Sequence, residues 1–318
     1  MKQQSLDASG FEKYRKKTRK ELFLEQMNEI LPWVELCKAI EPFYPKASAL
    51  GGRPAIGLER MLRIHFLQHW FELSDPGAEE ALYDSRAMRQ FVGIDLGKEP
   101  VPDETTICKF RHLMERHNLG GELFQLVNVY LEENGLKLNR GTIVDATIID
   151  APRSTKNKER HRDPDMESTQ KGNQWYFGMK THIGVDSQTR LIHSVVVTSA
   201  SVHDSQVLGD LLHGNEKRVY GDSAYIGQKA QIKANAEDAA DFTHRRGRRN
   251  HPLSEKERKA NRHKSKIRPR VEHLFGVIKN QFGYRKVRYK GLEKNAQAVF
   301  TKCALANLVI AKRHLLAI

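Results

Sequence analysis

The sequence changes its pattern at Leu138. Before this residue, apolar residues recur at helical spacing in short segments, which are bounded by residues that begin or end helices, such as Asp103 and Gly135. After it, "GTIVDATIID" is a β-branched run of strand length. Helical spacing and strand-like runs are typical of different kinds of secondary structure. The chain is therefore predicted to place an all-helical region before an α/β region.

The α/β region is predicted to form a mixed sheet flanked by helices. Strands are expected in "MKTHIGVDSQTRLIHSVVVTSA", "KRVYG" and "DFTH", and "SVHDSQVLGDLLH" is expected to be a helix with Asp204 as its cap. The polar residues 151–178 are expected to form an insertion on the surface. The predicted organisation is a basic helical arm at 1–44, a helical domain at 45–137 and an α/β domain at 138–318.

Proline and capping residues predict where helices begin and end in the arm and in the helical domain. Pro32 and Pro42 are expected to break the arm. In the helical domain, Asp75 is expected to cap a helix that has Pro76 at its first position and runs to Gly93.

The net charge of +14 is confined to one segment. Residues 244–290 hold 17 Lys and Arg against 3 acids, a balance of +14, so the rest of the chain is neutral. A solvated basic loop is one interpretation. A surface for the phosphate backbone of nucleic acid is favoured, because the same segment carries a regular apolar stripe.

Other classes of protein find no support in the sequence. No run approaches the roughly 18 uncharged apolar residues that a bilayer span needs, and the N-terminus has no apolar stretch of a secretion signal. The cysteines, Cys37, Cys108 and Cys303, are far apart and indicate neither disulfides nor a zinc site. The protein is therefore expected to act in the cytoplasm, without a membrane partner.

Three acids occupy positions where a carboxylate needs an explanation. Asp145 lies inside the apolar "TIVDATII", where desolvation is costly unless cations or donors satisfy it. Asp222 follows the strand in "VYGDSAYIG", at the sheet edge where ligand crevices form. Glu272 lies on a helix that is expected to begin at Pro269 and end at Gly283.

The helix of Glu272 has a basic line beside its apolar face. At about 100° per residue, Arg268, Glu272 and Lys279 fall on one line at the border of that face. The face itself consists of Val271, Leu274, Phe275, Ile278 and Phe282.

Each acid also has a structural interpretation. Asp145 could be a hydrogen-bonded core acid, Asp222 a turn cap, and Glu272 the i, i+4 partner of Arg268. Taken together in a basic field, the three favour a shared metal site instead. All are oxygen donors, which suit Mg²⁺ or Mn²⁺, and two such ions about 4 Å apart can serve phosphodiester chemistry.

Several long motifs resemble one known family, the DDE transposases of bacterial insertion sequences, and within them the insertion sequence 5 family. The resemblance covers nearly the whole chain. It rests on "GGRPAIGLERMLRIHFLQHWF", "VPDETTICKFRH", "IVDATIIDAP", "TKNKERHRDPDMESTQKGNQWYFGMKTHIGVD", "YGDSAYIG" and "RPRVEHLFGVIKNQFGYRKVRY".

The resemblance implies a ribonuclease-H-like catalytic domain at 138–318, with the acidic triad on Asp145, Asp222 and Glu272. It also implies two Mg²⁺ ions, with Mn²⁺ able to substitute, and cleavage and joining of double-stranded DNA at the element's inverted-repeat ends and at a target. The helical domain, 45–137, would bind DNA. At least a dimer is expected in the active DNA complex, and the protein would associate with the nucleoid.

Related enzymes carry a Tyr-Arg-Glu-Lys signature around the last acid. Arg268, Glu272 and Lys279 match it, whereas Ser265 stands at the Tyr position. By resemblance, Arg268 and Lys279 would bind phosphate close to the cleaved bond. Further DNA contacts are expected from Arg270, Arg285, Lys286 and Arg288.

The remaining candidates are ambiguous. Trp175 could stack on an exposed base, but an anchor in the core is the preferred interpretation. Asp204 is interpreted as a helix cap rather than a fourth ligand. Asp150 is left out of the site, because a regular strand would point it away from Asp145. A helix with Arg111 could lie in a DNA groove, although packing against its neighbours is more usual.

Two alternative functions stay open at this point. One is a nuclease of the same fold that cuts but never joins. The other is a non-enzymatic DNA-binding repressor derived from a transposase, against which the intact acidic triad argues.

Overall fold

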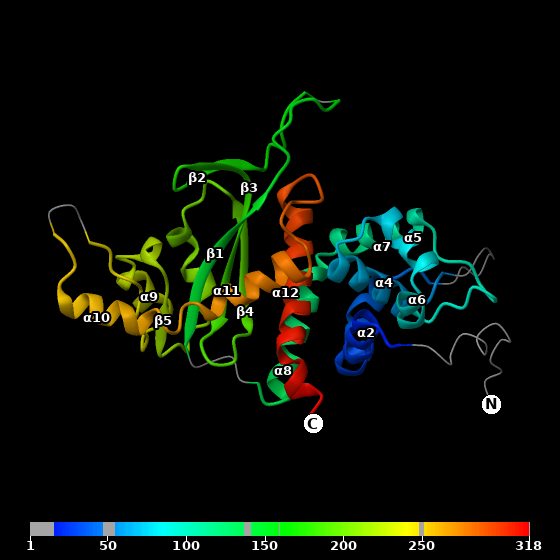
Figure 1. Ribbon diagram of the computed structural model, residues 1–318, viewed down its shortest axis with the longest axis horizontal. Helices are drawn as coiled ribbons and strands as arrows, with labels where there is room; N and C mark the ends of the chain where they lie inside the picture. Colours follow the sequence, from blue (N-terminus) through cyan, green and yellow to red (C-terminus); the bar gives the residue numbers. More distant parts are fainter. Residues whose placement is uncertain (1–15, 47–54, 137–140, 159, 248–250, 318) are drawn as a thin grey trace.

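The computed structural model describes residues 16–46, 55–136, 141–158, 160–247 and 251–317. Figure 1 shows a helical region on one side, a sheet on the other, and two long helices between them. The first part of the predicted arm and the predicted change of pattern at Leu138 lie outside the described residues.

The helical region is built from short helices, most of which have a capping residue. Its elements are α2 (Arg19–Ile30), α3 (Trp33–Ile40), η2 (Glu41–Phe43), α4 (Leu58–Phe71), α5 (Asp75–Asp84), α6 (Arg86–Val92), α7 (Glu104–Arg116) and α8 (Leu119–Glu133). The expected break at Pro32 is present between α2 and α3. Asp103 caps α7 as predicted, since its side chain accepts from the backbone N–H of Thr106.

One expected helix is divided in two. Ser74, not Asp75, caps α5, because the Ser74 hydroxyl accepts from the Gly77 N–H. Ser85 then ends α5 and caps α6. Periodicity does not reveal this break at "YDSR", because the helical spacing of apolar residues continues across it. Gly93 ends α6 with φ of 75°, as expected.

The sheet has β1 (Thr142–Asp150) near its centre. The other strands are β2 (Glu167–Lys171), β3 (Gln174–Asp186), β4 (Ile192–Ser199), β5 (Arg218–Tyr220) and β6 (Ala240–Asp241). Their order is β2-β3-β1-β5-β6, and β4 also pairs with β3. β1 runs antiparallel to β3 along its whole length but parallel to β5 over only two residue pairs. The rest of the β5-side edge of β1 is therefore left for other elements to cover.

Two expectations for the α/β region need correction. The segment after β4 forms two 3₁₀ turns, η3 (Asp204–Val207) and η4 (Gly209–Leu211), instead of one α-helix. Within 151–178, β2 and the start of β3 form a hairpin that extends the sheet, so this segment is only partly an irregular excursion. After Asp222, a 3₁₀ turn, η5 (Ser223–Tyr225), precedes a short helix, α9 (Lys229–Asn235).

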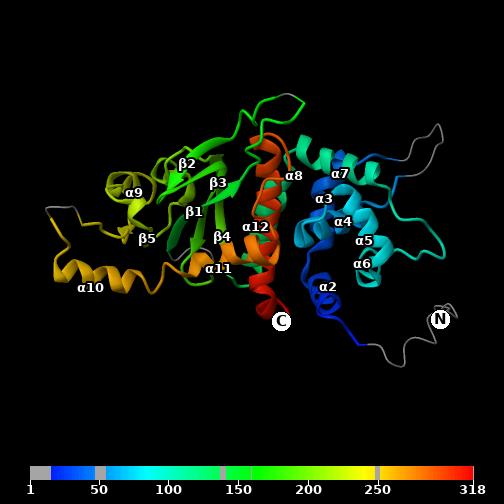
Figure 2. The same ribbon diagram turned by 45° about the horizontal axis from the view of Figure 1, so that its top comes forward.

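The C-terminal part of the chain is helical, and its last helix joins the two regions. The helices of this part are α10 (Glu255–Lys264), α11 (Arg270–Gly276), which continues into a π-helical turn, η6 (Val277–Gln281), and α12 (Leu292–Leu315). Figure 2 shows α12 between the sheet and the helical region. Gly120 on α8 allows its close approach, because a Cβ there would lie 2.5 Å from the Gln297 carbonyl oxygen of α12.

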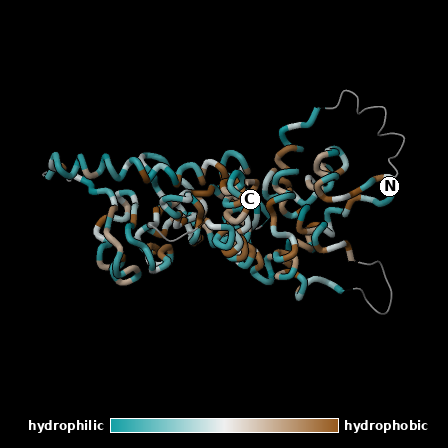
Figure 3. Tube along the Cα trace, turned by 90° about the horizontal axis from the view of Figure 1, so that it is seen from below, coloured by the Kyte–Doolittle hydropathy of each residue, from teal (hydrophilic) through white to brown (hydrophobic). Residues whose placement is uncertain are grey.

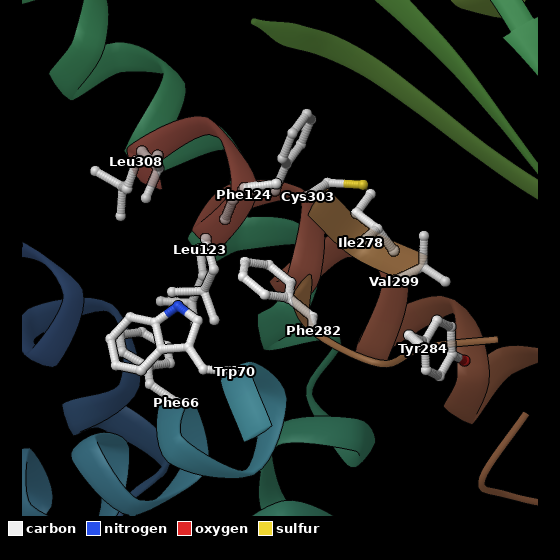
Figure 4. Close-up of a cluster of buried hydrophobic side chains, with 14 of the residues drawn as sticks. Phe66, Trp70, Leu123, Phe124, Ile278, Phe282, Tyr284, Val299, Cys303 and Leu308 are labelled. Carbon is white, nitrogen blue, oxygen red and sulfur yellow. The ribbon is translucent and has the colours of Figure 1, made fainter. Parts of the chain in front are cut away.

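One continuous hydrophobic core serves both regions. It contains Trp70 of α4, Ile143 of β1 and Cys303 of α12. Figure 4 shows part of this cluster, and Figure 3 shows hydrophobic residues along the helices at the centre of the molecule. Leu24 and Leu36 are buried in the same core, so the described helices of the predicted arm pack with the helical region. Across the described ranges, no helix combines the length and apolarity needed to cross a membrane.

Candidate active site

The parallel pairing of β1 and β5 brings two of the predicted acids together. Ile143 of β1 pairs with Tyr220 of β5. Asp145 and Asp222 each lie two residues further along, toward the carboxyl ends of these strands. Glu272 comes from α11, which packs against β1. The strand order and one helix thus place three distant parts of the chain at one edge of the sheet.

All three carboxylates contact the guanidinium of Arg268. Its Nη2 lies 3.2 Å from Asp145 Oδ2 and 3.9 Å from Asp222 Oδ2. Its Nη1 lies 3.5 Å from Glu272 Oε1. One cationic side chain therefore occupies the centre of the predicted triad.

The three acids differ in their environments. The side chain of Asp145 is only 13% exposed, and burial raises its pKa to about 6, against the opposing effect of Arg268. Asp222 also caps η5, accepting from the Ala224 N–H at 2.7 Å. Glu272 is 62% exposed. Asp222 is therefore a cap and Glu272 is the i, i+4 partner of Arg268, as their structural interpretations proposed. The three acids nevertheless also converge on Arg268.

The acids have the right chemistry for a hard divalent ion, but not yet the right spacing. Among the residues that the structure describes, no group of three His, Cys, Asp or Glu is close enough to hold a metal. The Arg268 guanidinium lies among the three carboxylates instead. The oxygen donors are of the type that Mg²⁺ and Mn²⁺ prefer.

A polar groove continues from Glu272 along the open edge of β1. It has a volume of about 440 Å³, within the range of roughly 300–1,000 Å³ for ligand pockets, and Lys279 and Arg285 line it. Lys279 Nζ donates to the Ile148 carbonyl oxygen of β1 at 2.6 Å. Burial, and after it the charge of Lys171, lowers the pKa of Lys279.

Sequence reasoning missed two residues of this groove. Lys171 and Tyr176 reach it from the β2–β3 hairpin. Both lie in the segment 151–178 that was expected to be a surface insertion, and both belong to the β2–β3 pairing. Asp150, which was left out of the site, lines the same groove.

Other predicted DNA contacts are partly engaged within the protein. Arg270 donates to the Ser187 carbonyl oxygen, and Arg285 donates to Asn280. Arg288 donates to the carboxylate and the carbonyl oxygen of Glu72. A backbone bridge holds Lys286 beside β1.

Trp175 and Asp204 both differ from their preferred interpretations. Trp175 is 59% exposed at the β2–β3 hairpin, so the core anchor is wrong. The cap of η3 is His203, not Asp204. Asp204 instead forms an ion pair with Lys180 at 2.9 Å, because the 3₁₀ turn directs it toward β3.

Arg111 packs inside the protein. It forms ion pairs with Asp75 and Glu115, both at 2.7 Å, and lies over the ring of Tyr289. The helix that carries it is thereby fixed against its neighbours, as the more usual alternative proposed.

Two transposase family models match this chain. The family "Transposase DDE domain" matches residues 137–308, more than half of the chain, and includes all three acids. The chain belongs to the DDE transposases. A second family, "Transposase domain (DUF772)", matches residues 12–113 of this transposase. The cryo-EM structure of a piggyBac transposase synaptic complex with hairpin DNA is similar over 93% of this chain and 75% of that chain, with 10% identity and a TM-score of 0.46.

Proposed function

We propose that this transposase belongs to the insertion sequence 5 family of bacterial elements and acts on the inverted-repeat ends of its own element. It would cleave a strand at each end and join the freed 3′-hydroxyl to target DNA. The observation that carries the proposal is the contact of Asp145, Asp222 and Glu272 with one cationic group at a sheet edge, inside the DDE domain.

A ribonuclease-H-like fold is proposed for residues 138–318. Its support is the arrangement of β1, which carries Asp145 between antiparallel β3 and parallel β5. The separate boundaries at 44/45 and 137/138 remain part of the proposal, with the helical domain contributing to recognition of DNA.

The proposed chemistry divides the work among named residues. Asp145, Asp222 and Glu272 would hold two Mg²⁺ ions, or Mn²⁺ in their place, which supply activation of the attacking oxygen and stabilisation of the leaving one. Arg268 and Lys279 would hold the phosphates beside the cleaved bond. Cleavage and joining are both in-line phosphoryl transfers, so one site serves both without a covalent enzyme intermediate.

The proposed partners follow from the charge distribution. The basic segment 244–290 continues through α10, whose residues are all solvent-accessible, into the site at Arg268. A duplex bound along this segment would reach the acids. Because two ends must be joined, the active complex is proposed to contain at least a dimer, associated with the nucleoid.

The test compares four full-length variants on DNA that carries the element's terminal repeats. D145N, D222N and E272Q should each abolish Mg²⁺-dependent nicking while end binding persists. The matched control is D241N, because Asp241 lies in the same sheet and its carboxylate caps the Thr243 N–H. Nicking that survives any of the three site changes refutes the assignment.

A second assay separates the alternative functions. Precut ends are incubated with a target plasmid, and joined products are expected from the wild-type protein. Cutting without joining would identify a nuclease. End binding without any nicking would identify a repressor.

A further inference from the structure

We propose that Arg268 is a built-in counter-cation that occupies the metal position and must be drawn away before divalent ions bind. The consequence is that DNA binding and metal binding assist each other. This inference rests on the proposed function, since it assumes that the three acids hold the ions and that DNA phosphate reaches the site.

The placement of the guanidinium is the first observation. It contacts carboxylates from β1, from the turn after β5 and from α11, at 3.2, 3.9 and 3.5 Å. Only the Asp145 contact is a hydrogen bond, and Nε of Arg268 is buried with no hydrogen-bond partner within the described ranges. The group is therefore held mainly by charge, not by a complete set of hydrogen bonds that would fix it there.

Charge balance is the second observation. Asp145 and Asp222 both contact this guanidinium, at 3.2 and 3.9 Å, so their like charges lie close together. Two buried or half-buried like charges need a cation between them. Arg268 supplies it, so an incoming divalent ion meets both a positive charge and an occupied space.

The position of Arg268 in the chain gives it a path out. It lies between α10 and α11, in a turn that follows the last residue of α10. α10 has no buried residue and belongs to the basic segment 244–290. A phosphate bound there would offer the guanidinium a bidentate partner in exchange for the carboxylates.

Exchange of partners makes the two binding events reciprocal. If DNA withdraws Arg268 from the acids, it strengthens metal binding, and metal must then strengthen DNA binding by the same factor. A purely structural role for Arg268 predicts the opposite sign, because loss of the residue would let the acids repel each other and weaken the site.

The test measures Mn²⁺ binding by the full-length protein, by electron paramagnetic resonance of free Mn²⁺, without and with duplex DNA carrying the terminal repeat. Without DNA, R268Q should bind Mn²⁺ about tenfold more tightly than wild type, within the usual range of site coupling. R268K keeps a cation and should fall between them. DNA should tighten Mn²⁺ binding by wild type, and not by R268Q.

Two controls make the result decisive. R218Q removes the same charge from an exposed side chain of β5, outside the basic segment, and should bind Mn²⁺ like wild type in the absence of DNA. D145N should lose Mn²⁺ binding, which tests the proposed metal site separately. Equal or weaker Mn²⁺ binding by R268Q than by wild type, with D145N still defective, overturns the counter-cation while leaving the proposed function intact.

Discussion

Replacement of Asp145 by Asn should stabilise the metal-free protein while destroying its activity. Burial raises the pKa of Asp145 from 3.8 to about 6, so ionisation is harder in the folded protein than in the unfolded chain. The contribution of this group to stability is therefore complete below pH 4 and is lost as the pH rises through about 6. At pH 8 the ionised carboxylate costs folding free energy that an amide would not.

The size of the effect follows from the shift. A difference of about 2 pKa units corresponds to about 3 kcal/mol at 1.36 kcal/mol per unit, and the side chain is nearly buried, so little of it is lost to solvent screening. Arg268 loses one of its three carboxylate contacts in the variant, which reduces the gain. A net stabilisation of about 1–3 kcal/mol at pH 8 is expected.

The assay is urea unfolding of wild type and D145N in EDTA, at pH 8 and at pH 4.5. The difference between the two proteins should be large at pH 8 and small at pH 4.5, because wild-type Asp145 is then mostly protonated. D241N, which removes an exposed carboxylate of the same domain, serves as the control for loss of one negative charge. If D145N is less stable than wild type at pH 8, the reasoning that desolvation of Asp145 outweighs its contacts is refuted.

Three further changes test other parts of the structure. Glu72→Ala should lower the free energy of unfolding by about 3–5 kcal/mol, because it leaves the ammonium of Lys302 buried without its charge partner. Lys302 is 3% exposed and lies 2.7 Å from the Glu72 carboxylate. A small loss of stability in urea unfolding would contradict this. Trp175→Ala should change stability by less than about 0.5 kcal/mol, yet weaken binding of ends with unpaired bases by about tenfold, as seen in a fluorescence anisotropy titration; unchanged affinity would exclude stacking. Lys279→Gln should reduce the slope of log affinity against log salt by about one, and an unchanged slope would remove Lys279 from the phosphate contacts.

The parts that follow local rules could be predicted from the sequence. Strand-like segments predicted the positions of β1 and β5. Gly93 and Asp103 predicted the end of α6 and the start of α7. The positions of Asp145 inside β1 and of Asp222 just after β5 follow from the same strand signals, and the parallel pairing of β1 with β5 brings the two acids together. The position of Glu272 could not be predicted in the same way. Helical periodicity places it beside an apolar face, but it does not indicate which strand that face packs against.

The rest depends on contacts that no local pattern encodes. The sequence predicted that Arg268 binds phosphate, but not that it lies among the acids. That position depends on the packing of three segments that are distant in the sequence. Trp175 is of a type usual in cores, yet in the β2–β3 hairpin, where it pairs with Gln170, it is exposed. The shared core of the two regions is equally invisible in sequence, because α12 is apolar toward both of them.

The central claim is that Asp145, Asp222 and Glu272 share divalent ions at one sheet edge. The most direct measurement is anomalous diffraction from crystals of the DNA-bound protein soaked with Mn²⁺. We expect anomalous peaks between these three carboxylates, with oxygens at about 2.1 Å and the Arg268 guanidinium moved toward phosphate. Peaks at other residues, or Arg268 still among the acids beside a well-occupied Mn²⁺ elsewhere, would contradict the account.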